Sequence, residues 1–266
     1  MTQGAVSRQI TALEAFVGVA LFRRTRRGVA LTERGAEYAD QVAQRLQALE
    51  QDTLDVMSTR GSGGTVHLAA VPTFATRWLI PRLPDLALKH PDITVHIETR
   101  TRAFMFADTA FDAALYAGTA EQVSQWAGTH SHHLLAEDVV PVCSPSFLSG
   151  LRELSPQEIA QLPLLQQSTR PLGWRQWFEA QGVSAPLALA GPRFELFSMT
   201  AAAAVHGLGL ALVPRLLVQP ELARGELVLA CDQPLRDERA YYLITPDRLD
   251  ERPVVKRFLT WLLEQV

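Results

Sequence analysis

Apolar positions near the start of the chain repeat with the period of an α-helix. Residues 6, 10, 13 and 17 are apolar and fall on one stripe, and the opposite face is polar. That face carries the side-chain types that hydrogen-bond base edges and phosphates when a helix lies in the major groove of DNA. We therefore predict a helix whose DNA-contacting face includes Gln3, Ser7, Arg8 and Thr11.

The period changes after Gly28, where Val29 and Leu31 alternate with less apolar neighbours. This alternation predicts a strand and, together with the stretch before it, a small hairpin. A basic hairpin that follows a helix is the layout of a winged helix-turn-helix, in which the wing rests on phosphate. The alternative is a solvated charged loop beside an ordinary amphipathic helix. Four arginines are expected at the hairpin tip: Arg23, Arg24, Arg26 and Arg27.

Residues 35–60 contain no proline and predict one long helix. Its apolar or small positions 39, 42, 46, 49, 53 and 56 are spaced by three and four residues, which is the pattern of a coiled-coil seam. Apart from this stripe the helix is polar, so it needs a partner. We expect a partner to cover the stripe, although the helix could instead pack against its own domain.

Residues 61–64, Gly-Ser-Gly-Gly, predict a flexible linker and a domain boundary. Beyond them strands alternate with helices, which favours an α/β fold with a largely parallel sheet. A capping box at Ser155 and Glu158 marks one helix start, and prolines at 81 and 84 should kink or shorten another helix. The expected strands are 65–71, 93–99, 111–116, 132–142, 162–166, 193–196, 208–213 and 239–245. The expected helices are 74–88, 103–109, one starting at 156, 173–181, 198–207 and 253–266.

Charge is divided unevenly along the chain. The net charge is −3, yet residues 1–34 hold six arginines against two glutamates. This segment is therefore positive where DNA is expected, and the remainder is negative. The two cysteines exclude a disulfide framework, and the sequence contains neither a signal-peptide pattern nor an apolar run of membrane-spanning length. We expect a soluble, cytoplasmic protein of two or three domains.

Several blocks of the sequence resemble the LysR-type transcriptional regulators. Residues 5–14, 21–24 and 31–35 resemble the recognition helix and wing of that family, in the same order and spacing. Residues 78–83, 111–115, 140–145 and 207–214 resemble its effector domains, especially those of the subgroup related to the glycine-cleavage activator and the β-lactamase regulator. Two further helices precede the recognition helix in the family. The resemblance therefore implies a partial winged helix-turn-helix in residues 1–34.

The resemblance also implies an architecture for the rest of the chain. The effector domain of the family has two Rossmann-like lobes joined by two crossover strands, as in periplasmic solute-binding proteins. In this sequence the crossovers are expected at 138–143 and 239–245. Lobe 1 then comprises residues 65–142 plus 239–266 and lobe 2 comprises 143–238, after a dimerisation helix (35–60) and a hinge (61–64). The family commonly forms dimers and tetramers.

The expected effector site is the cleft between the lobes. Val71, Pro72, Thr73 and Phe74 join a strand end to a helix start, where free backbone N–H groups and the Thr73 hydroxyl could hold a carboxylate or similar anion. Thr73 could also simply cap its own helix, and the two roles are compatible. The resemblance adds five residues, although each hydroxyl among them also fits a local turn or cap: Thr101, Ser144, Ser168, Thr169 and Phe197.

Other chemistry is weakly supported. His130, His132 and His133 have no second ligand cluster at a suitable spacing, so we expect no metal. Cys143 fits packing better than oxidant sensing. Residues 207–209 lack the third glycine of a dinucleotide fingerprint. No nucleophile elbow, phosphate loop or obvious acid/base pair is present, so we expect no cofactor and no enzymatic activity.

Together these features predict a LysR-type regulator whose promoter binding is controlled by a small-molecule effector, through a population shift between conformations. The predicted partners are promoter DNA, an effector that carries negative charge, and further copies of the chain as a homodimer or homotetramer. The alternative is a ligand-binding sensor module that has lost DNA binding through truncation of its N-terminus. Such a module would act through mixed dimers.

Overall fold

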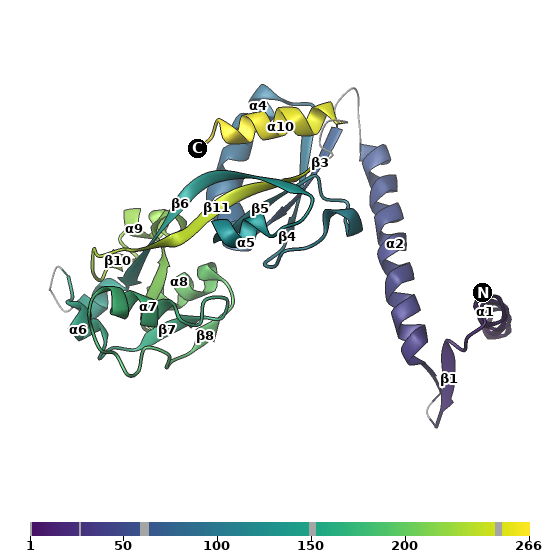
Figure 1. Cartoon of the computed structure of the whole chain (residues 1–266), viewed down its shortest axis with the longest axis horizontal. Helices are drawn as coiled ribbons and strands as arrows, with labels where there is room; N and C mark the ends of the chain where they lie inside the picture. The colour runs from purple at the N-terminus through teal and green to yellow at the C-terminus, as the bar shows by residue number, and fades with distance from the viewer. Residues whose placement is uncertain (1, 27, 59–63, 149–152, 248–251) are drawn as a thin grey trace. The chain divides into compact units, whose positions relative to one another are not determined.

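The computed structural model describes residues 2–26, 28–58, 64–148, 153–247 and 252–266 (Figure 1). The chain divides into two compact units, Met1–Arg60 and Gly61–Val266. Of the expected hinge at 61–64, residues 61–63 lie outside the described residues, and Gly64 already begins the first strand of the second unit. Within the described residues, no helix is long and apolar enough to cross a membrane.

The first unit consists of helix α1 (Gln3–Val17), strands β1 (Phe22–Thr25) and β2 (Gly28–Leu31), and helix α2 (Glu33–Ser58). The predicted hairpin is confirmed, because β1 and β2 pair antiparallel and Thr25 lies opposite Gly28. This register places Arg23 opposite Ala30 and Arg24 opposite Val29, within the paired strands. The prediction that four arginines lie at the tip is therefore wrong: Arg23 and Arg24 lie on β1, and residue 27 is outside the described residues.

Side-chain contacts fix the junction between α1, the hairpin and α2. The Glu14 carboxylate accepts hydrogen bonds from the backbone N–H groups of Leu21 (2.8 Å) and Phe22 (2.9 Å). Thr32 links the start of α2 to the same corner, since its hydroxyl donates to the carbonyl of Ala20 and accepts from the N–H of Gly35. A Cβ atom on Gly35 would lie 1.9 Å from the carbonyl oxygen of Leu21. This position therefore requires glycine.

The second unit is built on one curled sheet with strand order β4-β3-β5-β11-β6-β9-β7-β8, and β10 pairs with β6. At one end, β3 (Gly64–Ala70) is parallel to β4 (Ile93–Thr99) and to β5 (Ala113–Thr119). At the other end, β7 (Leu164–Gln167) is parallel to β8 (Arg193–Phe194) and to β9 (Leu210–Pro214). The α/β fold is thus confirmed, with a parallel arrangement inside each lobe.

Two long strands connect the lobes. They are β6 (Thr129–Cys143) and β11 (Leu235–Pro246), which pair antiparallel with each other. Figure 1 shows both strands running from one lobe into the other. β11 also pairs with β5 of lobe 1, and β6 pairs with β9 of lobe 2. Both strands begin before the crossover ranges expected from the sequence, so each one serves both lobes.

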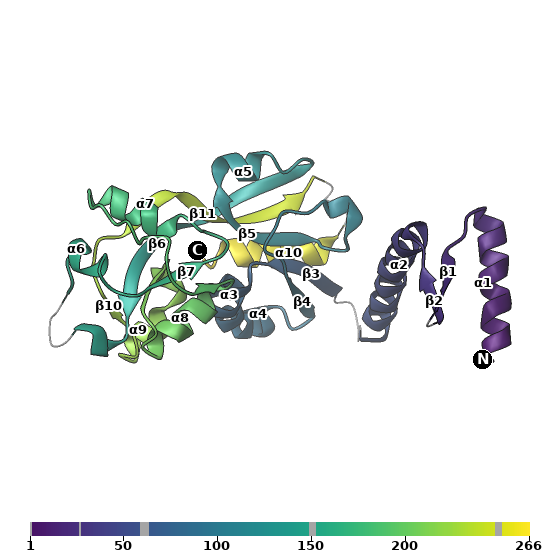
Figure 2. The same cartoon turned by 90° about the horizontal axis from the view of Figure 1, so that it is seen from below.

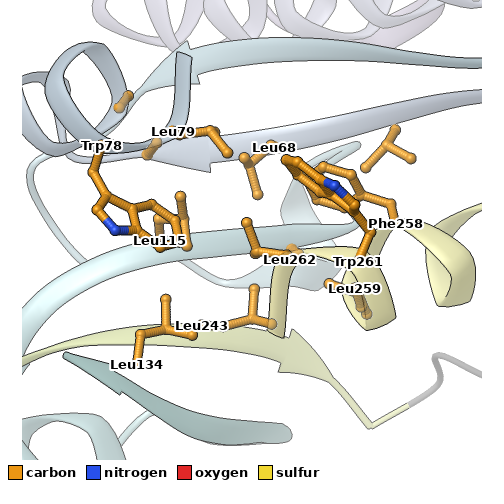
Figure 3. Close-up of a cluster of buried hydrophobic side chains, with 14 of the residues drawn as sticks. Leu68, Trp78, Leu79, Leu115, Leu134, Leu243, Phe258, Leu259, Trp261 and Leu262 are labelled. Carbon is orange, nitrogen blue, oxygen red and sulfur yellow. The ribbon is translucent and has the colours of Figure 1, made fainter. Parts of the chain in front are cut away.

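The helical region after β3 is broken where its prolines stand. It consists of α3 (Pro72–Phe74), a π-helical turn η1 (Ala75–Leu79), a 3₁₀ turn η2 (Ile80–Arg82) and α4 (Leu83–Lys89). Proline lacks the N–H that a continuous helix would use, so Pro81 and Pro84 force the hydrogen-bonding pattern to change. Beneath it, the lobe 1 core packs Trp78 and Leu79 with Phe258 and Trp261 of α10 (Pro253–Leu263) (Figure 3).

Lobe 2 begins with α6 (Pro156–Ile159), where the Ser155–Glu158 capping box is confirmed. Helices α7 (Gly173–Ala180) and α8 (Phe197–Val205) follow β7 and β8. Figure 2 shows α7 on one side of β7, and α8 with α9 (Gln219–Ala223) on the other. The sequence did not predict α9, α5 (Ala120–Ser124) or β10 (Val228–Leu229), because each is too short to show a period. The helix expected at 103–109 is not formed, and a 3₁₀ turn, η3 (Phe106–Asp108), stands in its place.

Candidate functional site

A cavity of about 260 Å³ lies where the two lobes meet the crossover strands. Lobe 1 contributes Thr73, Phe74 and Thr101 to its lining, and lobe 2 contributes Thr169 and Phe197. These five residues are among the seven that the sequence analysis proposed for an effector. Crossover strand β11 adds Arg239 and Tyr241, which were not predicted.

Thr73 links the two lobes. Its hydroxyl oxygen accepts a hydrogen bond from the backbone N–H of Ser198, at the start of α8, over 3.2 Å. It does not cap its own helix, where Val71 is the N-cap residue and no side chain supplies a capping bond. That helix continues directly into η1, so residues 72–74 form the first turn of a longer helical segment, where the positive end of the backbone dipole lies. The anion-binding role that we expected at this helix start stays a prediction.

Two of the predicted residues lie outside the cleft. A second cavity, of about 410 Å³, adjoins this one. Ser144 follows the end of β6, shares a hydrogen bond with the hydroxyl of Ser146 (3.0 Å) and lines neither cavity. Ser168 is exposed and also lines neither cavity. Gln167 ends β7 and Thr169 lies in the turn that follows, and both line the cavity, whereas Ser168 between them does not. Resemblance to a family motif could not settle this one-residue difference.

A buried ionic cluster lies beside the cavity at the crossover strands. The Glu137 side chain on β6 is 1% exposed and forms a two-pronged ion pair with Arg170, whose Nη2 lies 3.0 Å from Oε1. Tyr241 on β11 donates its hydroxyl proton to the same Oε1 over 2.7 Å. Burial and the adjacent negative charge of Glu137 raise the pKa of Tyr241 well above its usual value, so the phenol stays a neutral donor. Arg170 also lies over the ring of Phe197, 4.8 Å from its centroid.

Sequence reasoning missed this cluster because its members come from three distant segments. The available signal was Glu137, a carboxylate near the start of an apolar strand segment, since a buried charge in a strand is paired. The identity of its partners could not be read from the pattern. A second ion pair also joins the lobes: Arg77 of η1 lies 2.5 Å from Glu221 of α9.

The proposed DNA-contacting residues lie on the first unit. Ser7 and Arg8 are exposed on α1, and Arg23, Arg24 and Arg26 are exposed on the hairpin. The Arg8 guanidinium donates to the carbonyl of Gly4 over 3.4 Å, which leaves its other N–H groups free for an external acceptor. Of the remaining two predicted residues, Gln3 begins α1 and Arg27 lies outside the described residues.

The other candidate groups show no sign of a site. Among the described residues, no cluster of His, Cys, Asp or Glu side chains is suited to a metal ion. His130 forms an exposed ion pair with Asp247 over 3.3 Å. Cys143 is buried, and burial raises the pKa of its thiol to about 11. The reactive thiolate is therefore disfavoured near neutral pH.

Two family profiles match the chain, and together they span almost all of it. One is described as the LysR substrate binding domain and matches residues 59–266. The other is described as the bacterial regulatory helix-turn-helix protein, lysR family, and matches residues 1–36, which include α1 and the hairpin. The chain belongs to the LysR family of transcriptional regulators.

Similar proteins extend over the full length of this LysR-type regulator. It is 33% identical over 264 residues to the glycine cleavage system transcriptional activator of Escherichia coli K12, covering 99% of this chain and 85% of the relative. It is 31% identical over 265 residues to the transcriptional activator AmpR of Rhodobacter capsulatus, covering 100% of this chain and 88% of the relative. The predicted subgroup is thereby confirmed.

Solved structures agree with this assignment. The effector domain of AmpR from Pseudomonas aeruginosa superposes with a TM-score of 0.65 at 28% identity, over 75% of this chain and 94% of that one. The full-length virulence activator AphB from Vibrio cholerae superposes with a TM-score of 0.64 over 99% of this chain and 90% of that one. At 21% identity, the second likeness supports the fold alone.

LysR-type regulators bind promoter DNA and small-molecule effectors and act as oligomers, and this chain carries both of the corresponding domains. The helix-turn-helix match favours a regulator over a ligand-binding module without DNA contacts. The members of the family are regulators of transcription, not enzymes.

Proposed function

We propose that this LysR-type regulator responds to a small anionic effector held in the cleft by Thr73, Phe74, Thr101, Thr169 and Phe197. The observation that carries the proposal is the cavity at the crossover strands, which is lined by residues of both lobes. Its lining is rich in hydroxyl groups and includes two guanidinium groups. Arg170 and Arg239 both line the cavity, and we assign the effector's negative charge to Arg239, which reaches the cavity from crossover strand β11.

Effector binding would act on the arrangement of the lobes. A ligand shifts a conformational equilibrium only when its affinity for the two states differs. In this cleft a ligand would contact residues of both lobes and would lie beside the hydrogen bond from Ser198 to Thr73. Its affinity must therefore depend on how far the lobes are closed. We propose that this closure is what changes promoter binding.

Promoter contact is assigned to α1 and the hairpin. We propose that Gln3, Ser7 and Arg8 reach the major groove, and that Arg23, Arg24, Arg26 and Arg27 contact phosphate. The exposure of Ser7, Arg8, Arg23, Arg24 and Arg26 supports the assignment.

Association is assigned to α2, where Leu46 and Leu49 are 60% and 61% exposed. We propose that these side chains are covered in a homodimer, that dimers pair as homotetramers, and that the protein acts in the cytoplasm.

The DNA contacts are tested by fluorescence anisotropy on the region upstream of the regulator's own gene, at two salt concentrations. Each phosphate contact that is lost should lower the slope of log affinity against log salt by about 1. Arg23→Ala combined with Arg24→Ala should therefore weaken binding and lower that slope by about 2. Arg193→Ala, which removes an exposed arginine of lobe 2, is the matched control. Equal slopes for all three proteins would refute the assignment.

The effector site is tested by thermal unfolding of the second unit in the presence of short carboxylates and amino acids. A compound that raises the melting temperature of the wild-type protein should lose most of that effect in Thr73→Val. Thr76→Val serves as control, because Thr76 lies on the next turn and does not line the cavity. If stabilisation persists in Thr73→Val, the effector lies elsewhere. Stabilisation without any binding to promoter DNA would favour the sensor module.

A further inference from the structure

A second and larger cavity, of about 410 Å³, adjoins the cleft on the side of lobe 2. The two cavities are neighbouring compartments, because five residues line both of them. The shared boundary consists of Gln167, Thr169, Arg170, Phe197 and Arg239. The second cavity has room for an aromatic or branched group of a ligand, because an apolar cavity of about 150 Å³ is enough to bind benzene.

The wall of the second cavity that lies away from this boundary is mainly apolar. Its apolar part includes Leu165, Leu212 and Trp174 of lobe 2, together with Val139 and Leu235 of the crossover strands. Polar residues that also line this cavity are Thr119, Gln176 and Glu238. The indole N–H of Trp174 donates to the carbonyl of Leu165 over 2.9 Å, so the polar atom of this side chain is already satisfied. Such a wall binds an apolar group well and a charged group poorly.

The guanidinium groups, in contrast, are at the boundary. Arg170 is held there by its ion pair with Glu137 and by its contact with Phe197. Arg239 lies on β11 opposite Thr119 and reaches both cavities. A ligand that fills both compartments must therefore carry its charge near the boundary and its apolar part beyond it.

We propose that the effector is an amphiphilic anion. Its carboxylate lies at the boundary beside Arg239 and Thr169, and an aromatic or branched aliphatic group enters the second cavity against Trp174 and Leu212. This inference rests on the proposed effector site in the cleft and adds the chemical class of the ligand. It also assigns a specificity role to α7, the helix that begins at the rim of the second cavity.

Gly173, the first residue of α7, offers a way to fill this cavity selectively. It lines the second cavity and not the first. A Cβ atom at this position would lie 3.7 Å from Leu212, an ordinary van der Waals distance. Leucine is also a better helix former than glycine. Gly173→Leu should therefore fold and occupy part of the cavity. Ala180→Leu adds a side chain of the same size to an exposed position of the same helix, so it is the matched control.

The experiment compares two probes by isothermal titration calorimetry: propanoate, and 3-phenylpropanoate, which adds only a phenyl ring. In the wild-type protein we expect 3-phenylpropanoate to bind at least tenfold more tightly. Gly173→Leu should weaken 3-phenylpropanoate tenfold or more and leave propanoate unchanged, and Ala180→Leu should change neither. Arg239→Gln should weaken both probes. The unfolding midpoint of each variant is measured alongside, so that loss of binding is not confused with loss of folding.

The outcomes separate the two proposals. If propanoate binds but the phenyl ring adds nothing, or if Gly173→Leu leaves the preference for the ring intact, the second compartment is refuted and the cleft site stands. If 3-phenylpropanoate binding depends on residue 173 and not on Arg239, the second compartment stands and the anionic role of Arg239 is refuted. If neither probe binds to the wild-type protein, both proposals are overturned.

Discussion

In the described part of the second unit the large apolar side chains close into four buried clusters. Among the side chains that the structure describes in the first unit, Leu21 is the only large apolar one that is buried. In that first unit Phe16 is 89% exposed, and Leu46 and Leu49 are each more than half exposed. The second unit thus has the cores that an independently folding domain needs. The first unit presents apolar and basic surface outward, as a module does when its partners are other macromolecules.

Charged residues differ between the units in the same way. The arginines described on the hairpin are all exposed, whereas the second unit buries the Glu137–Arg170 pair at its crossover strands. An exposed arginine is available to phosphate, and its loss costs little stability. A buried pair fixes the geometry of the strands that carry it, and its loss should be costly. The predictions below test this contrast.

The largest effect is expected for Glu137→Ala. This change leaves the Arg170 guanidinium without its carboxylate in a mostly buried position, and breaking a buried pair in this way costs about 3–5 kcal/mol. Urea unfolding of the second unit measures the loss. The control is Asp138→Ala, the adjacent residue, whose ion pair with Arg236 (3.0 Å) is largely exposed and should contribute about 1 kcal/mol at most. Equal losses for the two variants would contradict the contrast.

The next effect concerns the exposed stripe of α2. Leu46→Lys places a charge where we expect a second copy of the helix to pack, and the leucine lost from each copy contributes about 1.5–3 kcal/mol when buried. The dimer dissociation constant should therefore rise by roughly a hundredfold or more. Analytical ultracentrifugation measures this change. Gln41→Lys, an exposed change away from the stripe, should leave it unaltered. A dimer that survives Leu46→Lys would show that the copies associate through another surface.

The smallest effect concerns pH and Tyr241. Burial and the charge of Glu137 raise the pKa of this phenol well above its usual value in the folded chain, whereas an unfolded tyrosine titrates near pH 10. The stabilisation is therefore complete below about pH 10 and is lost as the pH rises toward the folded pKa. Above pH 10 the unfolding free energy of the wild-type protein should fall more steeply than that of Tyr241→Phe, by up to about 1.4 kcal/mol per pH unit. Parallel pH curves would rule out this linkage.

Local patterns in the sequence determined most of the elements. The alternation after Gly28 gave the hairpin, the stripe through Leu46 and Leu49 gave α2, and Ser155 with Glu158 gave the start of α6. These features depend on residues within a few positions of one another, so the chain itself records them. The prolines at 81 and 84 correctly indicated a disturbed helix, although the π-helical and 3₁₀ turns could not be named in advance.

Only the tertiary structure decided how the cleft is built. Thr73 meets the backbone of Ser198 across 125 residues of sequence, and Glu137 meets Tyr241 across 104. The tertiary structure also excluded Ser144 and Ser168 from both cavities and added Arg239 to their lining. Such contacts depend on how the two crossover strands bring the lobes together, and periodicity carries no record of which distant side chains then meet. The sequence therefore determined the elements and the family, and long-range packing decided which side chains line the site.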